Sequence, residues 1–340
     1  MNPMFKNIRG FADMWEEGWR IAERDKAYGS VSKPANLILC GMGGSSIGGA
    51  LLESLAFESS GIPIALCRGY TLPSWAGSET LVVCTSYSGN TEETLSAYED
   101  AGLRRCLRFC ITSGGELARL AESDGVPCVI IPGGLPPRAA LPYTFVPLLH
   151  LASVMGVAPI DRHVRTEATA LLQRLAVEYG DGAPNEATIV ADYLTGRVPV
   201  IYSGTGLMAA VNLRWRGQIQ ENAKTPAFGN LYPELNHNEI EGWESASDVL
   251  QRIAVVELAT SDDPPQVRRR MDVTRRLLEP KAAGWYRFEP EGKSALARLL
   301  SGVHLGDWVS YYLARNLEVD PMPVALIDAL KAALSAGEAG

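Results

Sequence analysis

Short apolar runs alternate with longer segments of helical hydrophobic period along most of this 340-residue chain. A short continuous apolar run is typical of a buried strand, whereas apolar residues at intervals of three and four indicate an amphipathic helix. In the first half the runs predict strands at residues 37–40, 64–68, 81–84, 107–111 and 128–131. Because helical segments separate these runs, we expect a parallel sheet with helices on both faces.

The second half of the chain repeats the same alternation. Its apolar runs predict strands at residues 198–202, 253–258 and 284–288. Amphipathic segments predict helices at about residues 7–25, 141–155, 161–179, 207–222, 265–278 and 294–316. The expected fold class is therefore α/β, with two doubly wound domains of one type. We divide the chain into an N-terminal helical segment (1–34), a first domain (35–155), a helical connection and linker (156–184), a second domain (185–320) and a C-terminal segment (321–340).

Composition and charge narrow the choice of partners. The chain is 46% hydrophobic and 21% charged, which is ordinary for a globular protein. Its net charge of −8 argues against a nucleic-acid partner, because such a partner favours a basic face. All six cysteines lie between Cys40 and Cys128 without C-x-x-C spacing, so a reducing cytoplasm is the simplest setting. The longest apolar stretch, at residues 145–160, contains prolines and His150 and is too short to span a membrane.

A loop rich in hydroxyl groups follows the third predicted strand, at residues 85–94. The hydroxyls come from Ser86, Ser88 and Thr91. Together with the backbone N–H groups of the helix that begins here, they suit a phosphate, although a polar turn that merely caps the helix is the alternative. Asn90 is the expected cap, with Glu93 as its reciprocal partner. The Gly-Lys-Ser/Thr signature of a nucleotide P-loop is missing from the sequence.

A second loop of small residues follows the first predicted strand, at residues 41–49. Its glycines allow a ligand to approach the backbone closely. A dinucleotide site would need a third glycine where Ser46 stands, and an acidic residue at the end of the next strand, where Arg68 stands. We therefore expect no nucleotide cofactor. Both loops lie at the carboxyl ends of parallel strands, and hence at one edge of the sheet, which favours the phosphate interpretation.

Candidate catalytic side chains come from three other segments. Arg138 precedes a helix in a Pro/Gly loop at the same sheet edge, where either a plain surface arginine or a cation facing an anionic centre is possible. Arg214, Gln218 and Glu221 share one helix face, and Glu221 near the helix end is a candidate general base. His237, in an Asn-His-Asn-Glu stretch, is open to catalysis or to a structural hydrogen bond. The sequence contains no histidine spacing typical of a metal site.

Four short motifs together resemble one family. They are Met-Gly-Gly-Ser at residues 42–45, Ser-Tyr-Ser-Gly-Asn-Thr-Glu-Glu-Thr at 86–94, Gln-Glu-Asn at 220–222 and Asn-His-Asn-Glu at 236–239. In this combination, and over nearly the whole chain, they resemble the bifunctional phosphoglucose/phosphomannose isomerases of the sugar isomerase (SIS) domain superfamily. The resemblance implies two SIS domains and a cofactor-independent aldose–ketose isomerase. Such an enzyme interconverts glucose 6-phosphate and mannose 6-phosphate with fructose 6-phosphate through a cis-enediol.

The resemblance also implies a role for each candidate residue. The sugar phosphate would be held in the first domain by Gly43, Gly44, Ser45, Ser86, Ser88 and Thr91. Glu221 would move a proton between C1 and C2, and Arg138 would stabilise the negative charge of the intermediate. His237 would assist ring opening from the partner subunit of a homodimer, and Lys331 of the C-terminal segment would also take part. No metal or other cofactor, no nucleic acid and no membrane is implied.

Two departures from the family pattern and two alternatives accompany this interpretation. Ala50 stands where similar enzymes often carry an acidic residue. The loop at residues 203–206 lacks the full hydroxyl set, so we expect one phosphate site per chain. One alternative is an SIS isomerase of another sugar-phosphate specificity, such as the isomerising half of an amidotransferase. The other is a non-catalytic sugar-phosphate sensor, which would not need Glu221 and His237 together.

Overall fold

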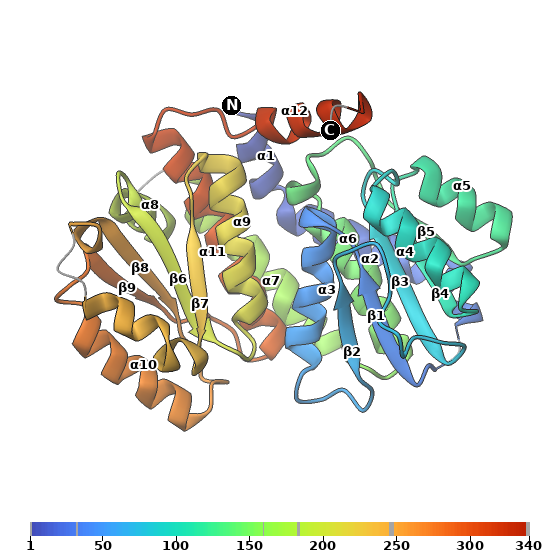
Figure 1. Ribbon diagram of the computed structural model, residues 1–340, viewed down its shortest axis with the longest axis horizontal. Helices are drawn as coiled ribbons and strands as arrows, with labels where there is room; N and C mark the ends of the chain where they lie inside the picture. Colours follow the sequence, from blue (N-terminus) through green and yellow to red (C-terminus); the bar gives the residue numbers. More distant parts are fainter. Residues whose placement is uncertain (1, 32, 159, 182–183, 245–247, 338–340) are drawn as a thin grey trace.

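Two parallel sheets lie side by side, and helices flank each of them (Figure 1). The predicted α/β class, with parallel sheets between helices, is therefore confirmed. The structure is a computed structural model that describes residues 2–31, 33–158, 160–181, 184–244 and 248–337. The linker expected between the two halves lies partly outside the described residues, at 182 and 183.

The first sheet has the strand order β2-β1-β3-β4-β5, and every neighbouring pair is parallel. Its strands are β1 (Asn36–Cys40), β2 (Ile64–Cys67), β3 (Thr80–Ser86), β4 (Leu107–Thr112) and β5 (Cys128–Ile130). Its helices are α3 (Gly43–Ala56), α4 (Glu92–Leu103), α5 (Gly115–Asp124) and α6 (Leu141–Val154). Successive strand residues face opposite sides of the sheet. Leu39 and Val83 thus join a core with α3 and α6, whereas Cys40 and Cys84 join a core with α4 and α5.

The second sheet repeats this arrangement with the parallel order β7-β6-β8-β9. Its strands are β6 (Val198–Gly204), β7 (Phe228–Tyr232), β8 (Ile253–Leu258) and β9 (Gly284–Phe288). Its helices are α8 (Glu186–Leu194), α9 (Ala209–Ala223), α10 (Pro265–Leu278) and α11 (Ala295–Asn316). Ile201 and Val256 face a core with α9 and α11, and Tyr202 and Val255 face the side covered by α10.

One hydrophobic core connects the two sheets. It contains Leu39 of β1 and Val256 of β8, together with residues of α3, α9 and α11. The remaining helices are α1 (Pro3–Arg9), α2 (Phe11–Arg24), α7 (Arg162–Gly180) and α12 (Ala325–Ser335). Short 3-10 helices are η1 (Lys26–Ser30), η2 (Pro137–Ala139), η3 (Glu234–His237), η4 (Glu239–Glu244) and η5 (Leu250–Arg252). Because the core is continuous, the two halves hold each other in place.

Several elements differ from the expectation. The helix predicted at 7–25 is two helices, α1 and α2, divided at Gly10, which ends one and starts the other. The edge strand β7 and the helices α8 and α12 were not predicted. β7 lies at the edge of its sheet and exposes Phe228 to 58%, so it lacks the continuous apolar run of a central strand. Among the described helices, none is long and apolar enough to cross a membrane.

Candidate active site

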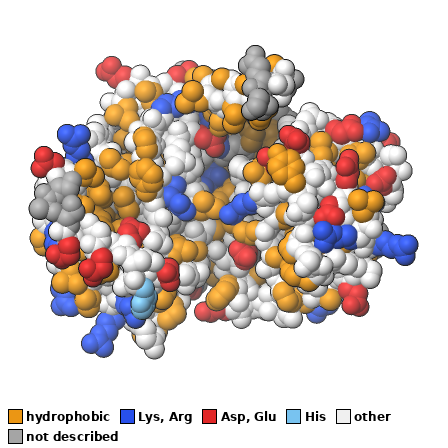
Figure 2. All heavy atoms as spheres, in the orientation of Figure 1, with side chains coloured by type: hydrophobic (Ala, Val, Ile, Leu, Met, Phe, Trp, Pro, Cys, Tyr) orange, Lys and Arg blue, Asp and Glu red, His pale blue; other side chains and the backbone are white. Residues whose placement is uncertain are grey.

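A cleft of about 240 Å³ lies between α3 of the first half and α9 of the second. Residues of both halves line it: Gly43, Gly44, Ser46, Ile47, Arg68, Arg138, Leu213, Arg214, Gly217, Gln218 and Glu221. Figure 2 shows a hollow between the two halves, with Lys and Arg side chains around it. Gly43 and Arg68 follow β1 and β2, so the cleft opens at the carboxyl edge of the first sheet, where doubly wound sheets bind ligands.

Arg138 lines this cleft from η2 and is only 3% exposed. Its Nε donates to Oδ1 of Asn222 at 2.7 Å, and its Nη1 donates to Oε2 of Glu221 at 3.3 Å. Its Nη2 donates to the carbonyl oxygens of Pro321 at 2.6 Å and Met322 at 2.9 Å. Partners from α9 and from the segment after α11 therefore hold the guanidinium.

The same bonds leave one donor of Arg138 for a ligand. They use four of the five guanidinium N–H groups, and the remaining N–H is on Nη1, beside Glu221. Burial lowers the pKa of Arg138, whereas the negative charge of Glu221 raises it. Arginine keeps its charge in either case because its reference pKa is so high. The result is a fixed cation with a spare donor, which suits stabilisation of a negative charge that develops during a reaction.

Glu221 supplies a carboxylate to the same cleft. It lies in the last turn of α9, and its side chain is 29% exposed, so a ligand can reach it. A carboxylate with one oxygen near a cation and access to the cleft can accept a proton from a bound molecule.

Arg214 and Gln218 occupy the same face of α9 but bind inward, to Asp307 of α11. Arg214 donates to both carboxylate oxygens, at 2.9 and 2.7 Å, and Gln218 donates to one of them at 2.8 Å. Burial raises the pKa of Asp307, while Arg214 and Gln218 oppose the rise. Arg214 also donates to the carbonyl oxygen of Arg138 at 3.1 Å. Arg214 therefore fixes the backbone of Arg138, while its own charge is balanced by Asp307.

The start of α3 contacts both neighbouring loops. Ser45 Oγ accepts a hydrogen bond from the backbone N–H of Tyr87 at 3.0 Å. A Cβ atom on Gly44 would lie 2.7 Å from the carbonyl carbon of Pro137, so only glycine fits against η2 there. These contacts bring the predicted phosphate residues of the two loops and the arginine of η2 to one edge of the sheet.

The hydroxyl loop, residues 86–91, is ordered by its own hydrogen bonds. Ser86 Oγ accepts from the N–H of Gly89 at 3.1 Å and shares a hydrogen bond with Thr91 Oγ1 at 2.9 Å. Ser88 Oγ accepts from the N–H of Asn90 at 3.2 Å. Neither the loop nor Ser45 lines the cleft. The loop is connected to the cleft wall by the bond between Tyr87 and Ser45, whose neighbours Gly44 and Ser46 do line it.

The predicted cap of the helix after this loop is wrong. α4 begins after Thr91, and no side chain of the described chain caps it; Asn90 and Glu93 form no capping box. Asn90 Oδ1 instead accepts the N–H of Glu116 at the start of α5, at 3.0 Å. Gly89 packs directly on the loop before α5, which brings Asn90 to that helix. The first N–H groups of α4 therefore remain available to an anion.

His237 and Lys331 lie away from the cleft of their own chain. His237 ends η3 and Lys331 lies on α12; both are exposed, and neither lines the cleft. The expected approach of His237 from a partner subunit stays a prediction, as does the role of Lys331.

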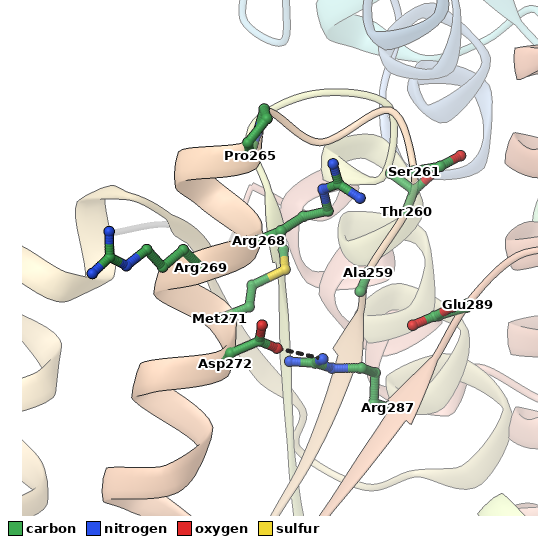
Figure 3. Close-up of a pocket in the computed structure, with 10 residues that line it drawn as sticks. All are labelled: Ala259, Thr260, Ser261, Pro265, Arg268, Arg269, Met271, Asp272, Arg287 and Glu289. Carbon is green, nitrogen blue, oxygen red and sulfur yellow. Dashed lines mark hydrogen bonds and ion pairs between the residues drawn. The ribbon is translucent and has the colours of Figure 1, made fainter.

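A second cavity, of about 480 Å³, lies at the carboxyl ends of β8 and β9 beside α10 (Figure 3). The matching strand orders make this the counterpart of the hydroxyl loop in the first half. Three arginines and two acidic residues line it: Arg268, Arg269, Arg287, Asp272 and Glu289. Arg287 pairs with Asp272 at 2.7 Å, so part of this positive charge is already neutralised.

The loop after β8 carries carboxylates that occupy its own donors. Asp263 Oδ2 accepts the N–H of Thr260 at 2.9 Å, and Asp262 Oδ2 accepts the Thr260 hydroxyl at 2.8 Å. Burial raises the pKa of Asp263 to about 6. Because a phosphate would meet these carboxylates, the hydroxyl loop of the first half is the better candidate for an anion.

Sequence reasoning missed several partners of the two buried arginines. Asn222 belongs to the Gln-Glu-Asn motif, which by itself assigns it no role. Nothing in the motifs points to Asp307 or to the carbonyl groups of residues 321–322. Asp307 could have been noticed as an acidic residue inside a largely apolar helical segment. Backbone carbonyls leave no such signal. Arg68, whose position at the end of the second strand argues against a nucleotide site, also lines the cleft.

Comparison with known proteins connects the chain to one group of enzymes. Residues 183–334 match the family model described as the bacterial phospho-glucose isomerase C-terminal SIS domain. A bifunctional phosphoglucose/phosphomannose isomerase from Caldicellulosiruptor bescii is 39% identical over 332 residues, which cover 96% of this chain and 98% of that protein. A D-glucosamine-6-phosphate 4-epimerase from Sulfolobus acidocaldarius is 35% identical, covering 68% of this chain and 72% of that protein.

Other relatives and one solved structure extend this picture. Three more proteins described as bifunctional phosphoglucose/phosphomannose isomerases are 32–35% identical over at least 88% of this chain. The C-terminal domain of a glucosamine-fructose-6-phosphate aminotransferase from Francisella tularensis has a similar structure, with a TM-score of 0.74 and 15% identity. The match covers 94% of this chain and 98% of that domain, and at this identity it shows a shared fold.

Proposed function

Because the chain belongs to the family of bifunctional phosphoglucose/phosphomannose isomerases, we propose that it interconverts glucose 6-phosphate and mannose 6-phosphate with fructose 6-phosphate, without a cofactor. The observation that carries this proposal is the pair of Glu221 and Arg138, which face one cleft beside the start of α3. A carboxylate next to a fixed cation suits proton transfer at a carbon adjacent to a carbonyl group.

The reaction needs only a proton acceptor and a stabilised oxyanion. Glu221 takes the proton from C2 of the open-chain aldose and later returns it to C1. The electron pair of the broken C–H bond forms the C1–C2 double bond of a cis-enediol, while negative charge develops on the carbonyl oxygen. The spare N–H on Nη1 of Arg138 donates to that oxygen. The hydroxyl proton of O2 passes to O1, and collapse of the enediol gives the ketose, so no oxidant or reductant is consumed.

The phosphate binds, in this proposal, where the hydroxyl loop meets the start of α3. Its ligands are the hydroxyls and backbone groups of Gly43, Gly44, Ser45, Ser86, Ser88 and Thr91. The hydrogen bond between Ser45 and the N–H of Tyr87, and the uncapped start of α4, support this assignment. Charge-assisted hydrogen bonds to the phosphate supply binding free energy that both the substrate and the enediol share.

Ring opening is assigned to His237 and Lys331. The exposed position of His237 on η3, outside the cleft of its own chain, supports its delivery to a partner's site in a homodimer. Lys331 lies on α12, which follows closely on the segment whose carbonyl groups bind Arg138. That connection supports a position for Lys331 near the reaction centre when substrate is bound.

The same proposal places the protein in the cytoplasm and keeps residues 35–155 and 185–320 as its two SIS domains. The six cysteines are all free, and most are buried in the first half, which supports a reducing compartment. A separate sheet in each of the two ranges supports the domain limits.

A coupled assay that starts from fructose 6-phosphate tests the proposed reaction. Glucose 6-phosphate and mannose 6-phosphate are detected separately, and we expect both to accumulate without added metal or nucleotide. If neither forms while calorimetry detects binding of fructose 6-phosphate, the protein is a sensor instead. A parallel incubation with glucosamine 6-phosphate, followed by NMR, tests for the 4-epimerisation named for the Sulfolobus acidocaldarius relative.

A further inference from the structure

Three consecutive carbonyl groups after α11, at residues 321–323, accept hydrogen bonds from two cations: Arg138, which lines the cleft, and Lys224 at the end of α9. The first two accept from Nη2 of Arg138, at 2.6 and 2.9 Å. The third accepts from Nζ of Lys224 at 2.6 Å, and the same Nζ donates to the carbonyl oxygen of Glu221. One short segment is thus joined both to the cation of the candidate site and to the helix turn that carries its base.

We propose that Lys224 is a positioning residue for the isomerase reaction. Its ammonium ties the last turn of α9, with Glu221, to the segment 321–323, which holds Arg138. The tie fixes the backbone from which the Glu221 side chain extends relative to the guanidinium of Arg138. This inference rests on the proposed function, because it assigns Lys224 to that reaction.

The contact between the base and the cation is too long to fix their separation by itself. Nη1 of Arg138 and Oε2 of Glu221 are 3.3 Å apart, whereas charge-assisted N–H···O bonds are typically about 2.7–2.9 Å long. Shorter bonds surround the pair: those of Arg138 to Asn222 and to residue 321, and that of Lys224 to residue 323. The surrounding bonds therefore set the geometry of the pair.

The end of α9 is a site that favours a cation with this reach. Lys224 has a left-handed backbone, with φ of 54°, and directly follows the last helical residue. The last carbonyl groups of a helix lack partners within it, and a positive charge there offsets the helix dipole. Two of the three N–H groups of the ammonium are used, one on the helix and one on the segment 321–323.

Lys224→Met tests the tie, because methionine has similar length and no donor. We expect kcat to fall about 10- to 100-fold, since small misplacement of reacting groups has effects of this size. KM for fructose 6-phosphate should change less than about threefold, because the phosphate ligands lie on other loops. Lys224→Arg, which can reach both carbonyl groups, should recover most of the lost kcat. Lys281→Met is the matched control, because Lys281 pairs with Glu244 on the surface, at 2.8 Å.

Hydrogen exchange of the α12 amides gives a readout that needs no substrate. α12 begins two residues after the tie, so Lys224→Met should speed its exchange about threefold or more, and Lys281→Met should not. Unchanged exchange together with unchanged kcat overturns the inference while leaving the proposed function intact. A wild-type protein without isomerase activity overturns the proposed function, and exchange then still decides whether the tie exists. Lys224→Gln replaces Lys224→Met if the latter does not fold.

Discussion

Replacing Arg138 by lysine separates the charge of this side chain from its hydrogen-bond geometry. The guanidinium donates to four acceptors, whereas an ammonium has only three N–H groups on one atom. At least one acceptor therefore loses its partner, and the bonds to Asn222 and Pro321 are buried. A buried acceptor without a partner costs about 1–3 kcal/mol.

Arg138→Lys should reduce both the stability of the fold and the rate of turnover, and the two effects can be measured separately. With one or two acceptors left unpaired, we expect Arg138→Lys to lower the free energy of unfolding by about 1–6 kcal/mol. The positive charge stays, but the spare donor beside Glu221 is lost, so kcat should fall about 100-fold or more. KM should change much less, because the proposed phosphate ligands belong to other loops.

Urea unfolding at pH 7 and steady-state kinetics from fructose 6-phosphate measure the two parts. Arg276→Lys is the control, because Arg276 is exposed on α10 and lines neither cavity described above. If Arg138→Lys keeps wild-type kcat while stability falls, Arg138 has a structural role only. If kcat and the free energy of unfolding both stay at the wild-type level, the hydrogen bonds of the guanidinium do not hold the site together. The reasoning about its spare donor then fails as well.

Four other changes test separate parts of the molecule. Glu221→Gln keeps the side-chain shape without the proton acceptor, so turnover should fall about 1,000-fold or more while calorimetry still detects substrate binding; turnover near the wild-type level contradicts the base assignment. Ser86→Ala combined with Ser88→Ala should raise KM about 10- to 100-fold through lost charge-assisted bonds, and an unchanged KM removes the loop from phosphate binding. Gly44→Ala should lower both kcat and the melting temperature, because the new Cβ would lie 2.7 Å from the backbone of η2; a variant with wild-type values shows that η2 can move freely. Asp263→Asn tests how the stability of the fold depends on pH, because the pKa of Asp263 is about 6 in the folded protein and 3.8 for the free side chain. The stability that the neutral carboxyl group contributes is therefore complete below about pH 4 and is lost as the pH rises through 6. Urea unfolding should therefore show the variant gaining about 2–3 kcal/mol on the wild type between pH 4 and 7, and a constant difference contradicts the shift.

The strands with a continuous apolar run were predictable from sequence, and β7, which lacks such a run, was not. Every residue of β3 is buried, so its sequence is an uninterrupted run of apolar and small residues. β7, with Gly229 and Asn230 inside it and Phe228 exposed at the sheet edge, has no such run. β7 forms because its backbone pairs in parallel with β6, and backbone hydrogen bonds do not require particular side chains.

Residue chemistry predicted the members of the candidate site better than their contacts. Arg138 and Glu221 were both chosen from sequence, but their contact joins positions 83 residues apart, and no local spacing encodes it. Asn90 shows the opposite case. A local capping rule predicts that its side chain caps α4, but in the structure it accepts the N–H of Glu116, 26 residues away. Helix caps are local preferences of modest size, so a tertiary contact can override them.

The candidate site divides its tasks between the halves less sharply than the sequence indicated. The sequence places the predicted phosphate ligands in the first half and the predicted base, Glu221, in the second. In the structure, Arg138 belongs to the first half, yet three residues of α9 hold it. Arg214 donates to the carbonyl oxygen of Arg138, and the guanidinium of Arg138 donates to Glu221 and Asn222. Gly44, at the proposed phosphate site, packs on the same short helix η2. The anchor and the cation are therefore held together through η2, and a rotation of one sheet relative to the other would move the base Glu221 of α9 away from both of them.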